Sequence, residues 1–443
     1  MVRRQRKPTA AAYKKVDVVN VHLWGYHIGA VALDPRWGYC VFEYTPEFVS
    51  IGLEPSPLHM PTRAGETFLF TDLPEATFKR LPAMLADTLP DDFGNALIDR
   101  YMAGKGLDKS MVTALDRLAY MGSRSMGALQ FKPTRSPPRR KPSAIELSDL
   151  VAHARRAVQG SLEDDGHANA ALRSILDVGT SAGGARAKAV IAWNPTTQEI
   201  RSGQMDAPDG FEHWLLKFDG MGTDNELGSG TAYGRIEYAY YLMACESGIA
   251  MSPCRLLEES GRAHFMTQRF DREGGNTRHH MQTLCAMNHL DYKTKGTHSY
   301  EQLFVTLDKL GLPYEQKEEA YRRMVFNVVG KNCDDHTKNT SFRLRQGHAW
   351  ELAPAYDISF AHNPQGEWTH QHLMSINGRF KDFSRADLLE LANRFGIGNA
   401  PQVIGQVVEA IAKWPGFAAQ AEVPTTVANA IARFHLLDLG KAA

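Results

Sequence analysis

The sequence predicts an α+β protein of more than one lobe, β-rich at its beginning and helical toward its end. Its 443 residues exceed the size at which one hydrophobic core keeps growing, so two or three lobes are expected. Before residue 50, short alternating apolar runs are separated by glycine and proline, which is typical of strands and tight turns. From Tyr300 onward, helical spacing dominates.

Composition narrows the class of protein further. The chain is 43% hydrophobic and 23% charged, as soluble globular proteins are, and its 50 basic and 50 acidic side chains cancel. No global field therefore favours nucleic acid or an anionic membrane. Five scattered cysteines without a CxxC pair favour reduced thiols over disulfides or structural zinc. With no signal-peptide pattern and no apolar run near 18 residues, we expect a cytoplasmic protein without membrane contact.

The first part of the chain is interpreted as an arm and a β-rich subdomain. Residues 1–15 are predicted to form a mobile basic arm, and the N-terminal β-rich subdomain with helices extends over 16–131. Its first strands are expected in a small antiparallel sheet over residues 19–23, 28–33 and 39–44. Helical spacing follows at Phe93, Leu97, Met111, Leu115 and Leu118.

Residues 132–142, KPTRSPPRRKP, are predicted to form a linker. Four prolines and five basic side chains leave nothing there that can be buried. A basic strap that contacts phosphate is the alternative, and it is less favoured in a protein of zero net charge. We place the main domain boundary here.

The next lobe, residues 143–268, combines a glycine-rich segment with a lysine inside an apolar strand. After a predicted helix over 144–158, TSAGGARAK (180–188) precedes an apolar strand, and its adjacent glycines would let the backbone approach an anion. Taken alone, a plain β-turn explains this segment better. Lys217 lies within the strand 212–218 and needs an anion if it is buried; an edge strand with the lysine reaching water is an equal alternative.

A helix and a hairpin complete this lobe. The helix over 235–247 has one buried stripe, and Glu237 beside it is a candidate ion-pair partner for Lys217. The stripe consists of Ile236, Tyr240, Met243 and Ser247. The hairpin over 254–258 and 262–268 turns at Ser260 and Gly261.

The stretch NCDDHTKN (332–339) concentrates polar side chains between two apolar runs, which indicates a site. Asp334 and Asn339 have the D-x4-N spacing of a kinase catalytic loop, in which the aspartate accepts the hydroxyl proton and the asparagine binds magnesium. Eighteen residues further on, after a hairpin turning at 346–348, Asp357 is expected to be the second magnesium ligand. Turn and cap roles are the alternatives for each residue alone.

The order of these features is that of the protein-kinase fold. A glycine-rich loop, a strand lysine, a helix glutamate, a hairpin, helices, D-x4-N, a hairpin and an aspartate follow one another. We therefore predict a protein-kinase-like bilobal fold with a helical C-lobe over 269–443, and phosphoryl transfer as the reaction class. Helices around 387–395 and 427–437 are expected to pack in that lobe.

Five segments resemble the HipA family of bacterial serine/threonine kinases, the toxins of type II toxin–antitoxin systems. They are TSAGGARAK, HFMTQRFDR (264–272), NCDDHTKN, APAYDIS (353–359) and LMSINGRF (373–380). The resemblance covers nearly the whole chain from Val16 and includes the β-rich region before the kinase lobes.

The resemblance implies roles for individual residues. Asp334 matches the catalytic base, and Asn339 and Asp357 match the ligands of Mg²⁺, with ATP as the implied phosphoryl donor. The positions that match the nucleotide site are Ala182, Gly183, Gly184, Lys188, Lys217, Gln268, Arg269, Phe270, His336 and Lys338. Ser181 matches the serine on which the family phosphorylates itself, with Thr180 as the fallback acceptor.

The resemblance also implies partners and leaves competing functions open. It implies a HipB-like helix-turn-helix antitoxin, contact with DNA only through that antitoxin, and a translation-related target such as an aminoacyl-tRNA synthetase. Gln268 and Asp335 depart from the best-known member, which has an acidic residue and a glycine there. The alternatives are a small-molecule phosphotransferase of the same fold and a binding module without catalysis. The intact Asp334, Asn339 and Asp357 argue against the latter.

Other polar residues are given ordinary structural interpretations. The pairs His279–His280 and His370–His372 lack a third ligand at fixed spacing, so surface or loop positions are favoured over a metal site. Cys333, beside Asp334, is interpreted as a small buried thiol and not as a nucleophile.

Overall fold

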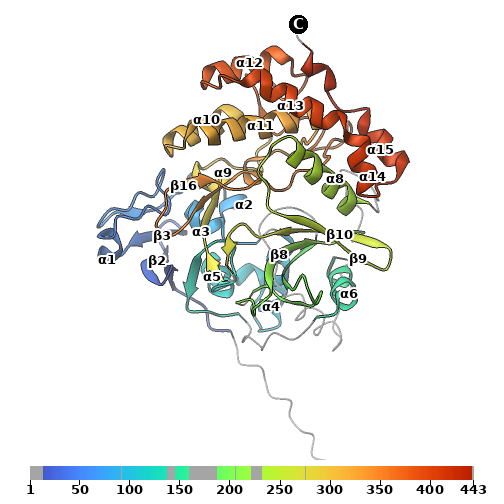
Figure 1. Ribbon diagram of the computed structural model, residues 1–443. Coiled ribbons are helices and arrows are strands. Elements are labelled where there is room, and N and C mark those ends of the chain that lie inside the picture. Colours follow the sequence, from blue (N-terminus) through green and yellow to red (C-terminus); the bar gives the residue numbers. More distant parts are fainter. Residues whose placement is uncertain are drawn as a thin grey trace, which may run out of the picture.

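The computed structural model describes residues 13–90, 92–136, 145–158, 187–204, 206–220, 232–274 and 276–441 (Figure 1). Most of the predicted arm, much of the predicted linker and residues 180–186 of the glycine-rich segment lie outside these ranges. None of the helices in the described part of the chain combines the length and the hydropathy that a membrane span requires.

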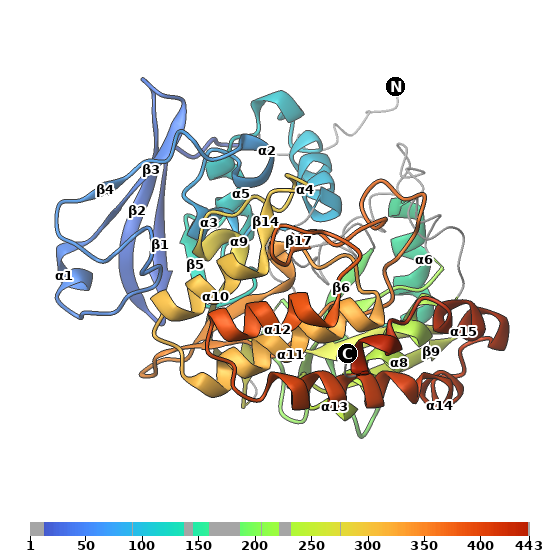
Figure 2. The same cartoon turned by 90° about the horizontal axis from the view of Figure 1, so that it is seen from above.

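A five-stranded antiparallel sheet forms the N-terminal region, on one side of the molecule in Figure 2. In spatial order its strands are β4 (Thr67–Phe68), β3 (Tyr39–Tyr44), β2 (Tyr26–Asp34), β1 (Val18–Leu23) and β5 (Leu129–Lys132). Alternation along β1 buries Val19, Val21 and Leu23, as the sequence predicts. At Gly29 of β2, a Cβ atom would lie 2.3 Å from the carbonyl oxygen of Glu43, so the close pairing of β2 with β3 requires glycine.

Short helices pack with this sheet. They are α1 (Pro46–Val49), α2 (Glu75–Phe78), α3 (Ala83–Ala86), α4 (Asp92–Ala103), the 3-10 turn η1 (Lys109–Met111) and α5 (Ala114–Met121). A capping box between Thr113 and Asp116 starts α5. Met111 precedes that box and is 46% exposed, so the helical spacing predicted from this residue was wrong there.

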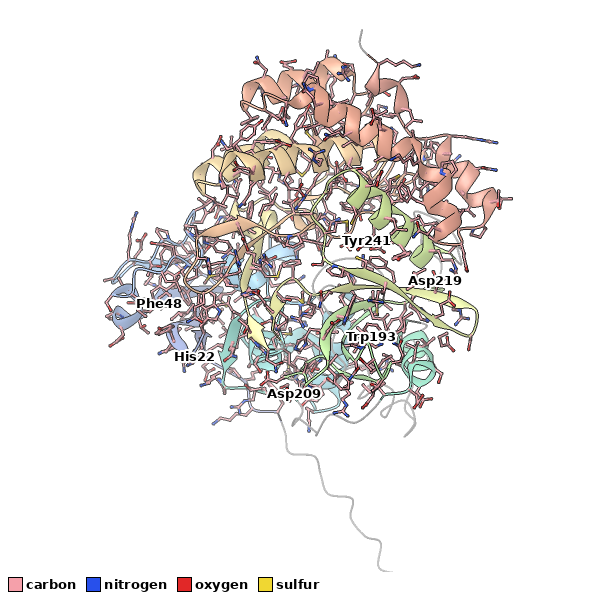
Figure 3. The ribbon with its side chains drawn as sticks, in the orientation of Figure 1. His22, Phe48, Trp193, Asp209, Asp219 and Tyr241 are labelled. Atoms are coloured by element: carbon pink, nitrogen blue, oxygen red, sulfur yellow. The ribbon has the colours of Figure 1, made fainter. Side chains whose placement is uncertain are left out.

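A second five-stranded antiparallel sheet follows, matching the strands and the hairpin expected for this lobe. Its spatial order is β7 (Ile200–Ser202), β6 (Lys188–Trp193), β8 (Glu212–Lys217), β10 (Arg262–Gln268) and β9 (Cys254–Glu259). Helix α6 (Leu147–Val158) packs against it through Leu150 and Ala154. Trp193 of β6, labelled in Figure 3, meets Trp214 of β8 edge to face, with 5.6 Å between ring centroids.

Helix α8 (Tyr233–Glu246) joins this sheet to the helical lobe, as Figure 1 shows. Its first turn lies so close to β10 that a Cβ atom at Gly234 would be 2.0 Å from the carbonyl oxygen of Ala263. The predicted stripe of Ile236, Tyr240, Met243 and Ser247 is buried. α8 is therefore held by the sheet at its start and by the helical lobe along its length.

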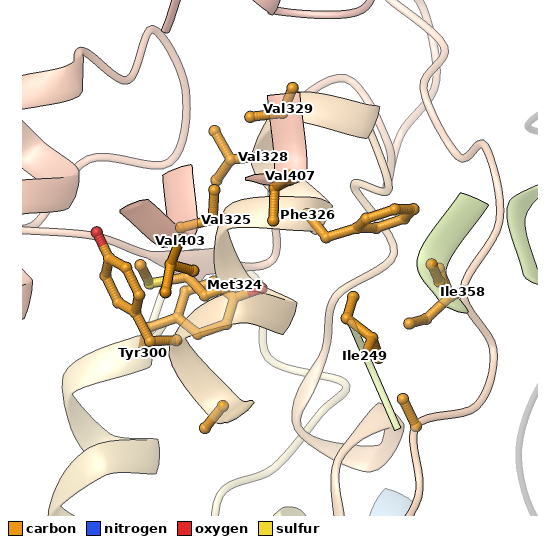
Figure 4. Packing of buried hydrophobic residues seen from close by; sticks show 14 of the residues in the cluster. Ile249, Tyr300, Met324, Val325, Phe326, Val328, Val329, Ile358, Val403 and Val407 are labelled. Atoms are coloured by element: carbon orange, nitrogen blue, oxygen red, sulfur yellow. The ribbon is translucent and has the colours of Figure 1, made fainter. Parts of the chain in front are cut away.

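The C-terminal lobe is built mainly from helices (Figure 1). They are α9 (Leu284–Met287), α10 (Tyr300–Lys309), α11 (Tyr314–Gly330), α12 (Arg385–Arg394), α13 (Ala400–Ala412), α14 (Trp414–Gln420) and α15 (Thr425–Ala432). Helix α11 is central: Met324, Val325 and Phe326 are fully buried, and Figure 4 shows its residues packed beside Val403 and Val407 of α13. The expected helix over 427–437 is shorter than predicted, because α15 ends at Ala432 and a 3-10 turn η3 (Leu437–Gly440) follows.

Short strands complete this lobe and carry the polar loops. They are β11 (Arg272–Glu273), β12 (Thr277–Arg278), β13 (His280–Thr283), β14 (His298–Ser299), β15 (Ser341–Leu344), β16 (Trp350–Leu352) and β17 (Met374–Ser375). β15 and β16 form the hairpin predicted to turn at 346–348, and β14 pairs in parallel with β17. The stretch 332–339 thus lies between α11 and β15, and Asp357 follows β16.

The N-terminal region is continuous with the rest of the protein through buried contacts. Its hydrophobic cluster includes Cys285 and Ala286 of α9. Asp87 accepts hydrogen bonds from the backbone N–H of Thr283 at 2.7 Å and from its hydroxyl at 2.8 Å. The indole N–H of Trp350 donates to the carbonyl of Glu54 at 3.0 Å. The N-terminal region therefore packs directly against α9, β13 and β16, which lie close to the loop 332–339.

Candidate active site

The stretch NCDDHTKN forms a loop that begins where α11 ends. Lys331 takes the left-handed conformation, with φ of 57°, and the N–H of Asn332 donates to the carbonyl of Asn327 at 2.9 Å. The N–H of Cys333 donates to the carbonyl of Ala361 at 2.9 Å. Because the 3-10 turn η2 (Thr337–Asn339) then leads into β15, the loop is fixed at both ends.

The two adjacent aspartates of this loop have opposite environments. The Asp334 side chain is 48% exposed and its carboxylate lies 3.8 Å from His336 Nε2. The Asp335 side chain is 1% exposed. Its carboxylate accepts hydrogen bonds from the Tyr300 hydroxyl at 2.7 Å, from His372 Nδ1 at 2.8 Å and from the N–H of Leu373 at 2.7 Å. Asp334 is therefore the acid that a substrate can reach.

Lys217 is the last residue of β8 and pairs in register with Lys188 of β6. Its ammonium forms ion pairs with Glu237 of α8 and with Asp357. Burial alone would lower the pKa of Lys217, but the Asp357 and Glu237 carboxylates raise it above its usual range. The alternative of a lysine that only reaches water from an edge strand is thus wrong, since β8 is a central strand and Lys217 is ion-paired.

Asp357 occupies the other side of this ion pair. Its φ of 52° is left-handed, an unfavourable conformation for a residue other than glycine and one that recurs at functional sites. Burial would raise the pKa of its carboxyl, but the charges of Lys217, Lys188 and His336 hold it below the usual range. Its side chain is 24% exposed, so the carboxylate is ionised and still accessible.

A pocket is lined by Asp357 and by residues of the loop 332–339. Its lining includes Asp335, His336, Asn339, Thr340, Tyr356 and Asp357. The side-chain amide of Asn339 donates to the carbonyl of Asp334 at 2.7 Å, which turns the amide oxygen away from that carbonyl. Within the described ranges, no three His, Cys, Asp or Glu side chains converge as a transition-metal site would require. The oxygen atoms of Asn339 and Asp357 instead suit Mg²⁺, which takes few protein ligands and completes its shell with water and phosphate.

Three candidates for the nucleotide site, Gln268, Arg269 and Phe270, lie at the end of β10 and directly after it, and their side chains have different partners. The ring of Phe270 stacks on Tyr356, a pocket residue, with 5.7 Å between centroids. Arg269 is buried, and its guanidinium donates to both carboxylate oxygens of Asp271 at 2.9 and 2.7 Å. Gln268 donates its N–H to the carbonyl of Pro253 at 2.8 Å. Phe270 is thus beside the pocket, whereas the Arg269 side chain is committed to Asp271.

The remaining nucleotide candidates are placed as follows. Lys188 begins β6 and is buried, so it belongs to the strand that follows the glycine-rich segment. The Lys338 ammonium lies over the ring of Tyr292, 5.1 Å from its centroid, and His336 packs against the same ring at 5.2 Å. The candidates Ser181, Ala182, Gly183 and Gly184, and the fallback Thr180, lie outside the described residues.

Several histidines expected at the surface are buried instead. His280 Nε2 lies 2.9 Å from the carbonyl oxygen of Pro55, and burial lowers the pKa of His280 to about 4. His279 is also buried, with Nε2 2.9 Å from a Glu273 carboxylate oxygen. The prediction of surface or loop positions was wrong for His280, which is buried in β13. His279 and His372 lie in loops, as that prediction allowed, but both are buried, and His370 is exposed.

The interactions of His372 and Cys333 were not found from the sequence. Burial would lower the pKa of His372, but Asp335 and Cys333 raise it to about 10. Cys333 is a buried thiol, as predicted; burial would raise its pKa, but His372 and His362 lower it to about 7. His372 directly precedes the LMSINGRF segment, and this position could have marked it as a candidate. The sequence does not indicate that Asp335 is its partner.

Comparisons with known proteins agree with this architecture. Two family models match the chain, the HipA N-terminal domain over residues 19–132 and the HipA-like C-terminal domain over residues 180–414. A chain in the structure of the Shewanella oneidensis MR-1 toxin–antitoxin complex of HipA, HipB and operator DNA is similar over 95% of this chain and 96% of that chain, with 16% identity and a TM-score of 0.64. This likeness confirms the predicted α+β fold.

A second solved structure, the Helicobacter pylori proinflammatory kinase CtkA, matches 52% of this chain and 89% of that chain, with 13% identity and a TM-score of 0.34. No curated protein sequence gives a significant match.

Proposed function

This chain belongs to the HipA family, and we propose that it is an ATP-dependent serine/threonine protein kinase that acts as a growth-inhibiting toxin. One observation carries the proposal. Lys217 is ion-paired with Glu237 and with Asp357, and Asp357 lines a pocket together with Asn339. Asp334 lies exposed in the same loop as Asn339. A lysine for phosphates, two oxygen ligands for Mg²⁺ and an accessible carboxylate are the groups that phosphoryl transfer requires.

The proposed reaction assigns one task to each group. Lys217 binds phosphate oxygens of ATP, and Asn339 and Asp357 would hold Mg²⁺, whose charge would offset that of the phosphates. The Asp334 carboxylate accepts the proton of a serine or threonine hydroxyl. The hydroxyl oxygen forms a bond to the γ-phosphorus while the bond from that phosphorus to the bridging oxygen breaks, so that ADP leaves.

The replacement Asp334→Asn tests the assignment. We expect label transfer from γ-labelled ATP to fall at least about a hundredfold, because a general base contributes about 10²–10⁴. ATP affinity measured by calorimetry should change little, since Asp334 does not bind the nucleotide. Asp308→Asn is a matched control, because the Asp308 side chain is 46% exposed and lies on α10. Full transfer by the Asp334→Asn protein would overturn the assignment.

Self-phosphorylation at Ser181 is part of the proposal. A phosphate on this serine would add about −1.5 to −2 charges at neutral pH. Beside the glycines it would compete with ATP for backbone N–H groups and switch the kinase off. Mass spectrometry of the labelled protein should find phosphoserine at Ser181 and none in the Asp334→Asn protein. Phosphate at neither Ser181 nor Thr180 would leave control to the partner alone, and transfer only to small molecules would favour the phosphotransferase alternative.

We also infer the partners from the family. The Shewanella structure holds HipA with HipB and operator DNA. We propose a HipB-like helix-turn-helix antitoxin for this chain, contact with DNA through that antitoxin, and a translation-related protein such as an aminoacyl-tRNA synthetase as the target in the cytoplasm. Phosphoproteomics after induction, compared between the active and Asp334→Asn proteins, identifies the target.

A further inference from the structure

The segment that follows Asp357 is attached to the catalytic loop on both sides of Asp334. Before Asp334, the N–H of Cys333 donates to the carbonyl of Ala361 at 2.9 Å, and the N–H of Ala361 donates to the carbonyl of Lys331 at 3.1 Å. After Asp334, the Asp335 carboxylate binds His372 and Leu373. The backbone of Asp334 therefore lies between two attachment points on one segment, residues 361–373.

The second attachment is an ion pair closed to solvent. The Asp335 and His372 side chains are each 1% exposed. The carboxylate accepts hydrogen bonds from three donors, one each from Tyr300, His372 and Leu373. Removing one partner of a buried ion pair leaves a buried charge uncompensated, so such pairs persist as a unit.

In protein kinases the corresponding segment is often ordered by phosphorylation, through pairing of the phosphate with arginine. Here the residues between Asp357 and His372 contain two hydroxyl side chains. Ser359 is half-buried and precedes the first attachment point, and Thr369, within the attached segment, is 5% exposed. Its carbonyl is occupied by His362 Nδ1 at 3.0 Å and by the N–H of Asn363 at 3.3 Å. In kinases of that kind, a phosphate paired with arginine holds the segment in place. In this chain the ion pair of Asp335 and His372 takes that place.

We propose that Asp335 and His372 are positioning residues whose ion pair holds residues 361–373 against the catalytic loop and keeps Asp334 oriented with no phosphorylation of that segment. The proposal deepens the kinase function and rests on it. Asp335 and His372 act through Asp334 and through the segment, and neither needs to touch substrate.

The test compares Asp335→Asn and His372→Gln with a matched control, Asp116→Asn. Asp116 is also a buried carboxylate with three donors, the N–H of Val16 at 3.2 Å and the N–H and hydroxyl of Thr113 at 2.9 and 2.8 Å. Label transfer from γ-labelled ATP to casein and to the chain itself gives kcat and the KM for ATP. We expect kcat to fall roughly tenfold to a hundredfold in the two positioning variants, as misplaced catalytic groups cause. The KM for ATP and both constants of Asp116→Asn should stay nearly unchanged.

Three further measurements keep the proposal testable if a single variant folds poorly or transfers little. The double variant Asp335→Asn/His372→Gln removes both charges; its loss should be smaller than the sum of the single losses, because both remove one pair. Hydrogen exchange reports the attachment without catalysis, and the Leu373 amide should exchange faster in Asp335→Asn. Thr369→Ala should keep its kcat.

Folded Asp335→Asn and His372→Gln proteins with the kcat of the control, or an unchanged Leu373 amide, would overturn the positioning role. So would phosphothreonine at Thr369 whose removal abolishes transfer. Full transfer by Asp334→Asn, in contrast, overturns the kinase assignment itself, so the two failures are distinguishable.

Discussion

Two charged clusters lie beside the loop 332–339 and differ in the exposure of their side chains to solvent. The Lys217 cluster, which consists of Lys217, Glu237 and Asp357, joins β8, α8 and the segment after β16. Its Asp357 side chain is 24% exposed and lines the pocket. The pair of Asp335 and His372 joins the loop 332–339 to the segment before β17. Asp335 also lines the pocket, but both side chains are only 1% exposed.

This difference separates binding from positioning. An ion pair with a solvent-exposed carboxylate can exchange one partner for a ligand, because phosphate or Mg²⁺ replaces the lost interaction. An ion pair closed to solvent cannot exchange partners without leaving a charge unpaired. The Lys217 cluster is therefore suited to binding nucleotide and metal, and the Asp335 pair is suited to fixing the backbone around Asp334.

A tyrosine of α8 connects the two regions. Tyr240 lies one turn after Glu237, and its hydroxyl donates to the carbonyl of Gly330, the last residue of α11, at 2.6 Å. The same hydroxyl lies 3.0 Å from His435 Nε2. The carbonyl of Val329 accepts from the N–H of Leu436 at 2.9 Å. The end of α11, where the loop 332–339 begins, is thus held by α8 and by the C-terminal residues.

Among changes to the two clusters, the largest effect is expected from Asp357→Ala, which disrupts the Lys217 cluster. It removes a proposed metal ligand and one of the two carboxylates that pair with Lys217. Transfer should fall roughly a hundredfold, as when a preorganised electrostatic group is lost. ATP affinity should fall when magnesium is present and change little in EDTA. Equal affinities of wild type and variant with magnesium, measured by calorimetry, would make Asp357 a structural residue.

The closed pair predicts a dependence of stability on pH. The pKa of His372 is raised from 6.5 to about 10. The contribution of this ion pair to the free energy of unfolding is therefore complete below pH 6.5 and is lost as pH rises toward 10. Neighbouring Tyr300 stays neutral there because burial raises its pKa well above the usual range, whereas Cys333, with a pKa of about 7, ionises and favours the cation. The difference in unfolding free energy between wild type and His372→Gln should therefore shrink between pH 8 and pH 10, as measured by urea unfolding.

His280→Gln is the control for this pH series. The pKa of His280 is lowered to about 4, so this imidazole is neutral at every pH above 6.5. The difference in unfolding free energy between wild type and His280→Gln should stay constant between pH 8 and pH 10. Parallel behaviour of the two variants would contradict a cationic His372.

The smallest effect is expected from Tyr240→Phe, which tests whether the two regions are coupled. Tyr321→Phe is the matched control, since Tyr321 is also fully buried and its hydroxyl donates to the carbonyl of Leu388 at 3.1 Å. Each variant should lose about 1 kcal/mol of stability, the usual contribution of one hydrogen bond. Only Tyr240→Phe should slow transfer, by about threefold, which is within the coupling that packed residues transmit. Equal transfer rates in the two variants would show that the regions act independently.

The local patterns of the sequence were sufficient to predict most of the strands and helices near the site. They also placed Asp334 and Asn339 in one loop. Alternation predicted β1 to β3, and an apolar run around Lys217 predicted β8, because side-chain periodicity depends only on neighbours along the chain. The D-x4-N spacing placed Asp334 and Asn339 in one loop for the same reason. Met111 was assigned wrongly because a capping box at Thr113 starts the helix later than its apolar spacing suggests.

Contacts between distant residues were decided by the tertiary structure. Lys217 meets Asp357 across 140 positions of sequence, and Asp335 meets His372 across 37. Asp334 and Asp335 are identical side chains in adjacent positions, so no local pattern distinguishes the exposed carboxylate from the buried one. Burial and ion pairing depend on which elements pack together, and that packing made one aspartate available to a substrate and the other part of the structure.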